Sequence, residues 1–319
     1  MKKFIYNIIS FGSVFILILI LFDFIVTTGL KKDTSNRYET WNRILNSEMS
    51  ADITIYGTSR AYHMYNPVII DSTLHCRSYN LGMSEVGFSG QYLRFKLYEK
   101  YNKSPKLIIL NFDYTMFRKY SNVENEQYLP YIRESEFRKI FKLVGLNYFD
   151  LYIPFHRYMG RKELISLGAK NFLSGNETSY SNHFKGFYAR EKSYNGIDDF
   201  DRISRYHDEL HIVEFDDLIL SEINDFADYC EDNNIKILLV HSPIFIDLKN
   251  NITNNDLMID LMKSLTVKYD NLNYLDYSED KMSLCQSYFF DALHLNNKGA
   301  DLFTRKLALD IDSLGILKK

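Results

Sequence analysis

The stretch that decides the fold reads Asp52-Ile-Thr-Ile-Tyr56, followed at once by Gly57-Thr58-Ser59-Arg60. Its first five residues are rich in β-branched and aromatic side chains, which predicts a short buried strand. The glycine after this strand predicts a tight turn into a helix. A serine at such a turn is exposed at the carboxyl edge of a parallel sheet, where α/β proteins place their sites. Ser59 is therefore the first candidate for chemistry.

The same alternation continues outward from this stretch. Further short apolar runs predict strands at 77–81, 107–110, 235–240 and 272–275. Stretches with helical spacing lie between and after them, at 91–101, 217–233, 257–269 and 298–309. Continuous apolar strands that alternate with helices are typical of a parallel sheet covered on both faces. The sequence thus predicts a three-layer α/β/α fold with about five parallel strands.

Residues 114–215 interrupt the alternation and contain 21 of the Phe and Tyr residues. A structureless loop of this length is implausible in a compact domain, so we expect an inserted subdomain. Its aromatic residues form either a second small core or a sugar-stacking surface, and packing is the commoner use of such residues. The expected organisation is an anchor at 1–30, a linker at 31–50, the α/β domain at 51–113 and 216–319, and this insertion.

The N-terminus is strongly apolar, with nineteen consecutive uncharged residues from Phe4 to Phe22. As a helix they would span roughly 28 Å, close to the hydrocarbon thickness of a bilayer. The run is too long for a signal peptide and lacks a small-residue cleavage site, which favours an uncleaved anchor with residues 4–30 in the bilayer. Lysines flank both ends of the span, so charge alone hardly orients it. A short basic tail before a large C-terminal domain favours an extracytoplasmic domain.

Composition excludes several other classes of protein. A net charge of −3 excludes a nucleic-acid binder that works by bulk charge. The three cysteines contain no C-x-x-C pair, so they predict neither a zinc knuckle nor a disulfide framework. No P-loop or G-x-G-x-x-G motif is present, and we expect no cofactor.

The second candidate for chemistry is Asp291-Ala-Leu-His294, just before the last predicted helix. At a turn, an Asp and a His three residues apart can converge, so that the carboxylate orients the imidazole and leaves its other nitrogen as a base. With a serine nucleophile this is the logic of a Ser-His-Asp triad. The alternative is a structural Asp-His pair that caps the helix.

Taken together in this order, the Ser59 turn and Asp291-Ala-Leu-His-Leu-Asn-x-x-Gly299 resemble the SGNH (GDSL-like) hydrolase superfamily. The resemblance implies an SGNH-like, flavodoxin-like fold, with Ser59 as nucleophile, His294 as base and Asp291 orienting the base. It also implies an oxyanion hole formed by the Ser59 N–H and two further donors. The implied donors are Gly82 and Asn111. Strict alignment of the family blocks instead places the backbone N–H of Glu85 at the position of the family's glycine, and Thr115 at the position of its asparagine.

Gly-Thr-Ser-Arg in place of Gly-Asp-Ser, together with the anchor, resembles the membrane-tethered members associated with cell-envelope polymers. This resemblance implies a serine acyl hydrolase or O-acyltransferase. Its partners would be an acyl donor or an acylated glycan, and a membrane-bound acyl-transfer protein. The alternative is a catalytically silent envelope protein that binds a glycan or takes part in an assembly complex.

Three further features are open to two interpretations. Arg60 follows the serine and His241 comes directly after the predicted strand 235–240, so both are expected to line the substrate site, although a turn that ends the strand explains His241 equally well. Tyr62 and His63 are expected to pack rather than to touch substrate. His207 and His211 have the spacing of a helical zinc pair, but they lack a third ligand nearby, which favours a solvated helix face.

Overall fold

The computed structural model describes residues 1–34, 36–117, 125–140, 145–174, 183–194, 213, 215–250 and 252–317. The chain forms two compact units. Unit 1 comprises Met1–Asn46 and Ser121–Ser179, and unit 2 comprises Ser47–Tyr120 and Tyr180–Lys319.

Unit 2 is built on a parallel five-stranded sheet. Its strands are β1 (Ile53–Tyr56), β2 (Ser78–Asn80), β3 (Leu107–Asn111), β6 (Lys236–His241) and β7 (Leu272–Asp276), in the order β2-β1-β3-β6-β7. Neighbouring strands are parallel throughout, with Ile55 of β1 opposite Asn80 of β2 and Ile109 of β3. The predicted α/β class and the five strands are confirmed. Because β2 lies on one side of β1 and the later strands lie on the other, the sheet changes its direction of growth at β1, and open α/β sheets place their ligand sites at the carboxyl end of the strands at such a point.

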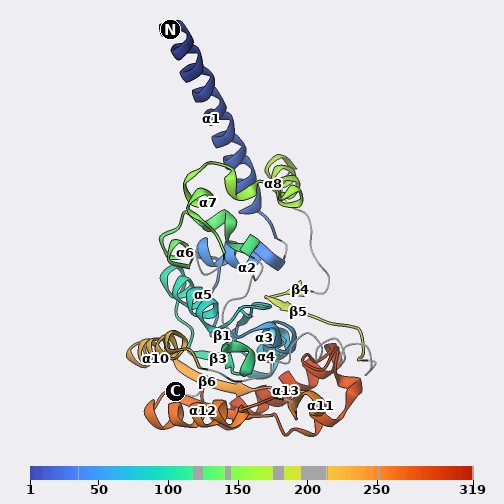
Figure 1. Cartoon of the computed structure of the whole chain (residues 1–319). Coiled ribbons are helices and arrows are strands. Elements are labelled where there is room, and N and C mark those ends of the chain that lie inside the picture. Colours follow the sequence, from blue (N-terminus) through green and yellow to red (C-terminus); the bar gives the residue numbers. More distant parts are fainter. Residues whose placement is uncertain are drawn as a thin grey trace. The chain divides into compact units, whose positions relative to one another are not determined.

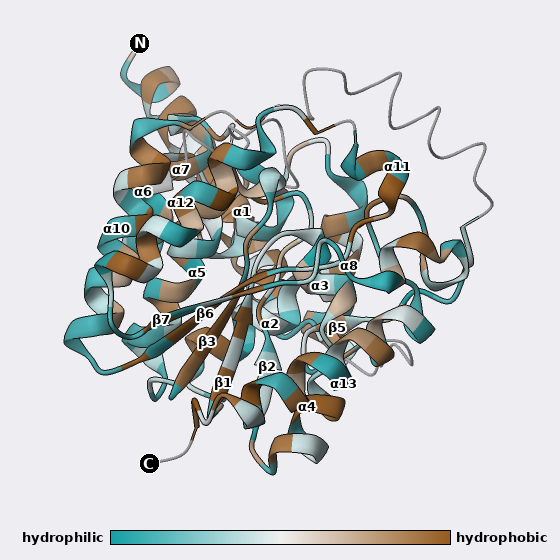
Figure 2. Ribbon diagram, turned by 90° about the horizontal axis from the view of Figure 1, so that it is seen from below, coloured by the Kyte–Doolittle hydropathy of each residue, from teal (hydrophilic) through white to brown (hydrophobic). Residues whose placement is uncertain are grey.

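Helices cover both faces of this sheet (Figure 2). On one face, α5 (Phe88–Tyr101) packs against α10 (Asp217–Asp232), and Lys268 of α12 (Asn255–Lys268) donates a hydrogen bond to Asn224 of α10. On the other face, α13 (Asn297–Ser313) packs against α3 (Ser59–Met64) and α4 (Pro67–Leu74). The central strands are hydrophobic along their length because helices exclude water from both of their faces (Figure 2).

Short elements lie at the carboxyl edge of the sheet. They are η1 (Tyr114–Phe117), α11 (Ile246–Lys249), η5 (Lys281–Leu284), η6 (Gln286–Tyr288) and the antiparallel hairpin of β4 (His183–Phe184) with β5 (Phe187–Tyr188). The hairpin lies against β2, where the Asn80 N–H donates to the Lys185 carbonyl over 2.9 Å. Gly186 has φ +78°, and a Cβ there would lie 1.8 Å from the Asn80 oxygen. Only glycine permits so close an approach.

Unit 1 is helical. Its elements are α1 (Lys2–Leu30), α2 (Asn36–Leu45), η2 (Asn125–Tyr131), α6 (Ser135–Ile140), α7 (Tyr148–Tyr152), η3 (His156–Tyr158) and α8 (Lys162–Ser174). The lower part of α1 packs along α8 (Figure 1). Gly29 and Gly168 mark the contact, since a Cβ on Gly29 would lie 1.7 Å from the Gly168 oxygen. Small residues therefore allow the two helix backbones to touch.

A compact aromatic core holds the rest of unit 1 together. Trp41 of α2 is fully buried against the rings of Tyr128, Tyr131 and Phe137, and its indole N–H donates to Gln127. The structure therefore differs from the expected organisation. The stretch 31–50, expected as a linker, contains the core helix α2, and the expected insertion 114–215 is divided between the two units.

Helix α1 has two unlike halves. By length and composition it is apolar enough to cross a membrane. Its side chains up to Phe22 are exposed apart from the half-buried Leu19, but Asp23, Val26, Gly29 and Leu30 are buried within unit 1. Within the expected span of 4–30, one side of the last two turns therefore packs against protein, while Phe24 stays exposed.

Candidate active site

Ser59 lies at the turn between β1 and α3. Gly57 has φ +142°, and a Cβ on it would lie 2.8 Å from Ala61 and 2.9 Å from the Asn111 side chain. A side chain at this position would force α3 away from the sheet. The glycine therefore lets the helix begin directly at Ser59, at the carboxyl end of β1.

The loop before α13 carries the other two residues of the predicted triad. A bridge between Phe289 and Leu295 closes this loop, and the Phe290 N–H donates to the His294 carbonyl over 2.8 Å. One carboxylate oxygen of Asp291 also accepts the backbone N–H groups of Leu293 and His294, each at 2.8 Å. These bonds fix the loop, so both side chains are held in place before any ligand binds.

The structure brings Ser59, His294 and Asp291 into one hydrogen-bonded series. Ser59 Oγ is 2.7 Å from His294 Nε2. His294 Nδ1 is 2.9 Å from each carboxylate oxygen of Asp291. An ionised carboxylate only accepts hydrogen bonds, so Nδ1 carries the proton and Nε2 accepts the hydrogen of the serine hydroxyl. This tautomer is the one that can remove a proton from Ser59.

The charge of Asp291 is maintained by its surroundings. Burial by itself raises the pKa of this carboxyl group, but the neighbouring His294 and the two backbone N–H groups outweigh burial and lower it to about 2. Asp291 is therefore an anion throughout the neutral range. It can hold the imidazole in place and stabilise the imidazolium that forms when His294 takes a proton.

Two of the predicted oxyanion donors are in the loop after β2. The Gly82 N–H already donates to Asn80 Oδ1 over 2.9 Å, so Gly82 does not provide the expected donor. Glu85 has an exposed side chain and a φ of +57°, a conformation that favours glycine. Within the described chain its N–H makes no hydrogen bond. Glu85 thus retains a backbone donor.

The other two predicted donors, Asn111 and Thr115, are occupied inside the protein. Asn111 is fully buried, accepts the Tyr65 hydroxyl hydrogen at 2.6 Å and donates its amide to Asp113. Thr115 donates both its N–H and its hydroxyl to Asp113. The expectation that either side chain completes the hole is not supported, because both serve the Asp113 carboxylate.

Arg60 and His241 are also internal rather than substrate-facing. The fully buried Arg60 guanidinium donates to the carbonyls of Ser242 and Pro243, and lies 3.7 Å from Asp113. His241 is 2% exposed, with Nδ1 3.4 Å from Asp276. Their contact with substrate stays a prediction, and in this structure both side chains contact only protein. Arg60 instead ties the start of α3 to the end of β6.

A second group of residues lies beside His294, of which the sequence singled out His63 but not Tyr188 or Arg190. The buried His63 ring lies edge-on to the His294 ring at 5.4 Å. Its Nδ1 is 2.9 Å from the Tyr188 carbonyl and its Nε2 is 3.3 Å from the Arg190 guanidinium. Burial and the neighbouring His294 lower the pKa of His63 well below its ordinary value, so it stays neutral. Packing, as expected for His63, is what the structure shows.

Tyr188 is the last residue of the hairpin strand β5 and Arg190 follows it, both within the expected insertion. Tyr188 stacks on Tyr62, and Arg190 lies 4.7 Å from the Phe290 ring centroid. They come from a segment more than a hundred residues distant from Ser59, and no motif marks them. Only the high aromatic content of the insertion hinted at such a contribution.

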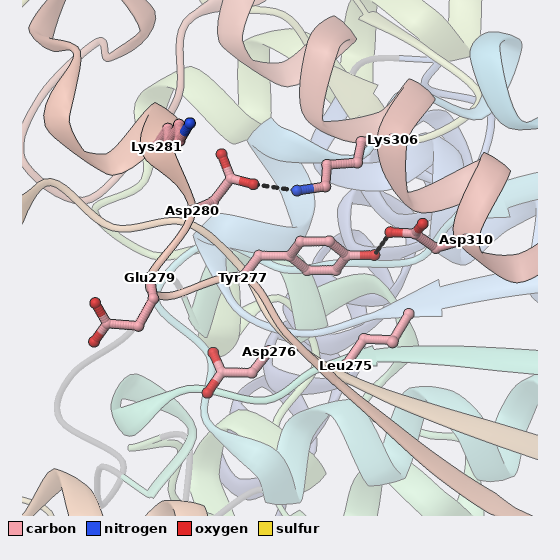
Figure 3. A pocket seen from close by; sticks show the side chains of 8 residues that line it. All are labelled: Leu275, Asp276, Tyr277, Glu279, Asp280, Lys281, Lys306 and Asp310. Carbon is pink, nitrogen blue, oxygen red and sulfur yellow. Dashed lines mark hydrogen bonds and ion pairs between the residues drawn. The ribbon is translucent and has the colours of Figure 1, made fainter.

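A separate hollow of about 750 Å³ lies beyond the end of β7 (Figure 3). Its side chains are largely paired with one another: Lys306 contacts Asp280, and the Tyr277 hydroxyl donates to Asp310 over 2.6 Å (Figure 3). None of the triad residues lines it. Among the described residues no cluster of His, Cys, Asp or Glu is placed to hold a metal ion. His207 and His211 lie outside the described residues.

Comparisons with known proteins give a limited result. No protein-family model matches the chain, and no curated protein matches it. Among solved structures, a candidate platelet activating factor from Streptococcus pneumonia is similar at a TM-score of 0.40 and 12% identity, over 89% of this chain and 93% of that one. A candidate acylhydrolase from Bacteroides fragilis is similar at 0.38 and 12% identity, over 82% and 86%. Similarity this weak leaves the function to be argued from the site.

Proposed function

We propose that the protein is a serine acyl hydrolase or acyltransferase that works through an acyl-enzyme on Ser59. The observation that carries the proposal is the 2.7 Å contact of Ser59 Oγ with His294 Nε2, backed by the ionised Asp291. A lone serine or a lone Asp-His pair has structural explanations. A serine, an imidazole and a carboxylate in series at the carboxyl edge of the sheet match the arrangement that activates a hydroxyl nucleophile.

In the first half of the reaction, Ser59 Oγ forms a bond to the ester carbonyl carbon while His294 Nε2 takes the hydroxyl proton. The backbone N–H groups of Ser59 and Glu85 are the donors left to stabilise the developing oxyanion. When the tetrahedral intermediate collapses, the ester C–O bond breaks and His294 returns the proton to the leaving alcohol. Ser59 then carries the acyl group.

In the second half, water or an acceptor hydroxyl attacks the acyl-enzyme. His294 takes the proton of the attacking group and returns it to Ser59 Oγ. Water gives hydrolysis and a sugar hydroxyl gives transfer. Together with an apolar helix that can enter a membrane, the resemblance to envelope-associated SGNH proteins supports an acylated cell-envelope glycan as substrate and an extracytoplasmic site.

The mechanism is tested by covalent labelling with an alkyl fluorophosphonate, which reacts with activated serines whatever the natural substrate. We expect one adduct, on Ser59 of the full chain, and none in Ser59→Ala. Loss of the base in His294→Ala should slow labelling by about 100-fold or more. The matched control is Ser264→Ala, which removes an exposed hydroxyl on α12 and should label like the unchanged chain.

An intact, folded chain that gives no adduct on Ser59 contradicts the mechanism. The catalytically silent binding protein then becomes the better explanation. Equal labelling of His294→Ala and the unchanged chain would likewise contradict the role of His294 as base.

A further inference from the structure

Unit 1 exposes an unusual group of large apolar side chains around α7. Tyr148, Phe149 and Tyr152 are 55%, 61% and 70% exposed, and Ile153 and Met159 follow at 41% and 59%. We call these five residues the aromatic collar. Single exposed apolar side chains are ordinary, but five within twelve residues indicate a surface that meets something other than water.

The collar is attached to α1 where the exposed apolar part of that helix ends. Between the collar residues, the Phe155 N–H donates to Asp23 over 3.0 Å, and the Phe155 ring lies 5.9 Å from Phe22. Just beyond, the Thr27 hydroxyl is 2.9 Å from the Tyr158 hydroxyl. Figure 1 shows α7 beside α1 at this level. The collar is thus continuous with the apolar surface of the helix.

A buried ion pair makes this junction firm. Asp23 is 2% exposed and 3.0 Å from the buried Arg157 guanidinium, and Arg133 adds a second contact at 2.9 Å. The charge of Asp23 is therefore satisfied by protein, so the helix can reach the edge of a bilayer without presenting a bare carboxylate to lipid. Breaking such a pair is costly, which holds α1 and the collar in one arrangement.

We propose that the aromatic collar lies in the headgroup region of the membrane that α1 enters. The nineteen uncharged residues that end at Phe22 span roughly 28 Å, which would place Asp23 and the collar at the boundary of the hydrocarbon. Tyrosine and other amphipathic aromatic residues concentrate at this boundary. The occupant of the surface is a lipid bilayer, and the inference is independent of the chemistry at Ser59.

The experiment uses the full chain in phosphatidylcholine–phosphatidylglycerol nanodiscs, with a tryptophan introduced in the collar by Tyr152→Trp. Lipids brominated near the headgroup quench tryptophan at the interface. The natural Trp41 is fully buried and gives the same background in every sample. The matched control is Asn46→Trp, at an exposed position directly after α2. Figure 1 shows that α2 is farther from the N-terminal end of α1 than α7 is.

We expect bromolipid to quench the Tyr152→Trp signal about twofold or more over background, and the Asn46→Trp signal hardly at all. If Tyr152→Trp does not fold, Phe149→Trp takes its place. Quenching in the collar equal to that of the control overturns the proposal. So does a blue-shifted collar tryptophan that bromolipid leaves unquenched, since protein rather than lipid would then cover the surface.

Discussion

Asp291 is the residue whose charge most directly couples the candidate site to stability. It is largely buried, yet its folded-state pKa of about 2 lies below the ordinary 3.8. An acid with a depressed pKa stabilises the folded chain in its ionised form. That contribution is fully present above the ordinary pKa and disappears as the pH falls through the folded-state value.

Replacing Asp291 with Asn should therefore lower the free energy of unfolding by about 2 kcal/mol near neutral pH, the equivalent of the pKa shift. The difference from the unchanged chain should hold down to about pH 5 and shrink towards pH 2. Urea unfolding followed by circular dichroism at several pH values measures it. Asp256→Asn, at an exposed position in the first turn of α12, should change stability by less than about 0.5 kcal/mol. A difference independent of pH contradicts this account of Asp291.

Candidate site residues were predictable from the sequence where a short local motif marks both the type of the residue and its place at a turn. Ser59, Asp291 and His294 stand at turns fixed by Gly57 and by the loop before α13, so neighbouring sequence was enough to find them. The oxyanion donors were not predictable in this way. Whether Asn111 or Thr115 is free depends on the buried Asp113, and whether an N–H is free depends on partners far along the chain.

At the scale of elements, the contact of α1 with α8 depends on backbone proximity. Gly29 and Gly168 face each other so closely that neither has room for a side chain. Gly12 lies in the same helix, but a Cβ there would have nothing within 4 Å. The two glycines of α1 therefore separate the effect of packing from the effect of helix propensity.

Gly29→Ala should destabilise unit 1 by about 1–3 kcal/mol, because the added methyl group must push the helices apart. Gly12→Ala should be neutral or stabilising by up to about 1 kcal/mol, since alanine favours the helix. Thermal unfolding of the full chain in detergent, followed by the fluorescence of the buried Trp41, compares them. Equal effects of the two substitutions would show that the close contact does not matter.

Elements with strong periodicity or continuous apolar runs were predicted well. All five strands of the sheet and its long helices were found because burial on both faces leaves a plain pattern. The hairpin of β4 and β5 was not, since each strand has only two residues. The stretch that contains helix α2 was predicted to be a linker because most of its residues are polar. The sequence does not show that Trp41 packs into a core.

At the scale of the whole molecule, the candidate active site and the apolar helix belong to different units. Unit 2 contains Ser59, His294, Asp291 and every candidate oxyanion donor. Unit 1 contains α1 and the collar. Because Val26, Gly29 and Leu30 are part of the unit 1 core, the anchor helix is also a structural element of that unit.

A chain that begins at Asp23 should therefore keep both units folded and label at Ser59 like the full chain. A chain that begins at Lys31 should lose the α1 contact with α8, and unit 1 should become sensitive to limited proteolysis. Ser59 of this shorter chain should still be labelled, since Ser59, His294 and Asp291 are all in unit 2. Equal protease resistance of the two shortened chains would contradict a structural role for residues 23–30.

The hairpin that lies on β2 has a consequence for solubility. β2 is an outer strand of the sheet, and an uncovered outer strand is a template on which another chain can add a strand. The Lys185 carbonyl occupies the Asn80 N–H, and Gly186 brings the hairpin backbone directly against this strand. A side chain at Gly186 would push the hairpin away from β2 and expose the backbone of that outer strand. Because Gly186 lets the hairpin cover β2, we expect it to reduce the pairing of this outer strand with other chains.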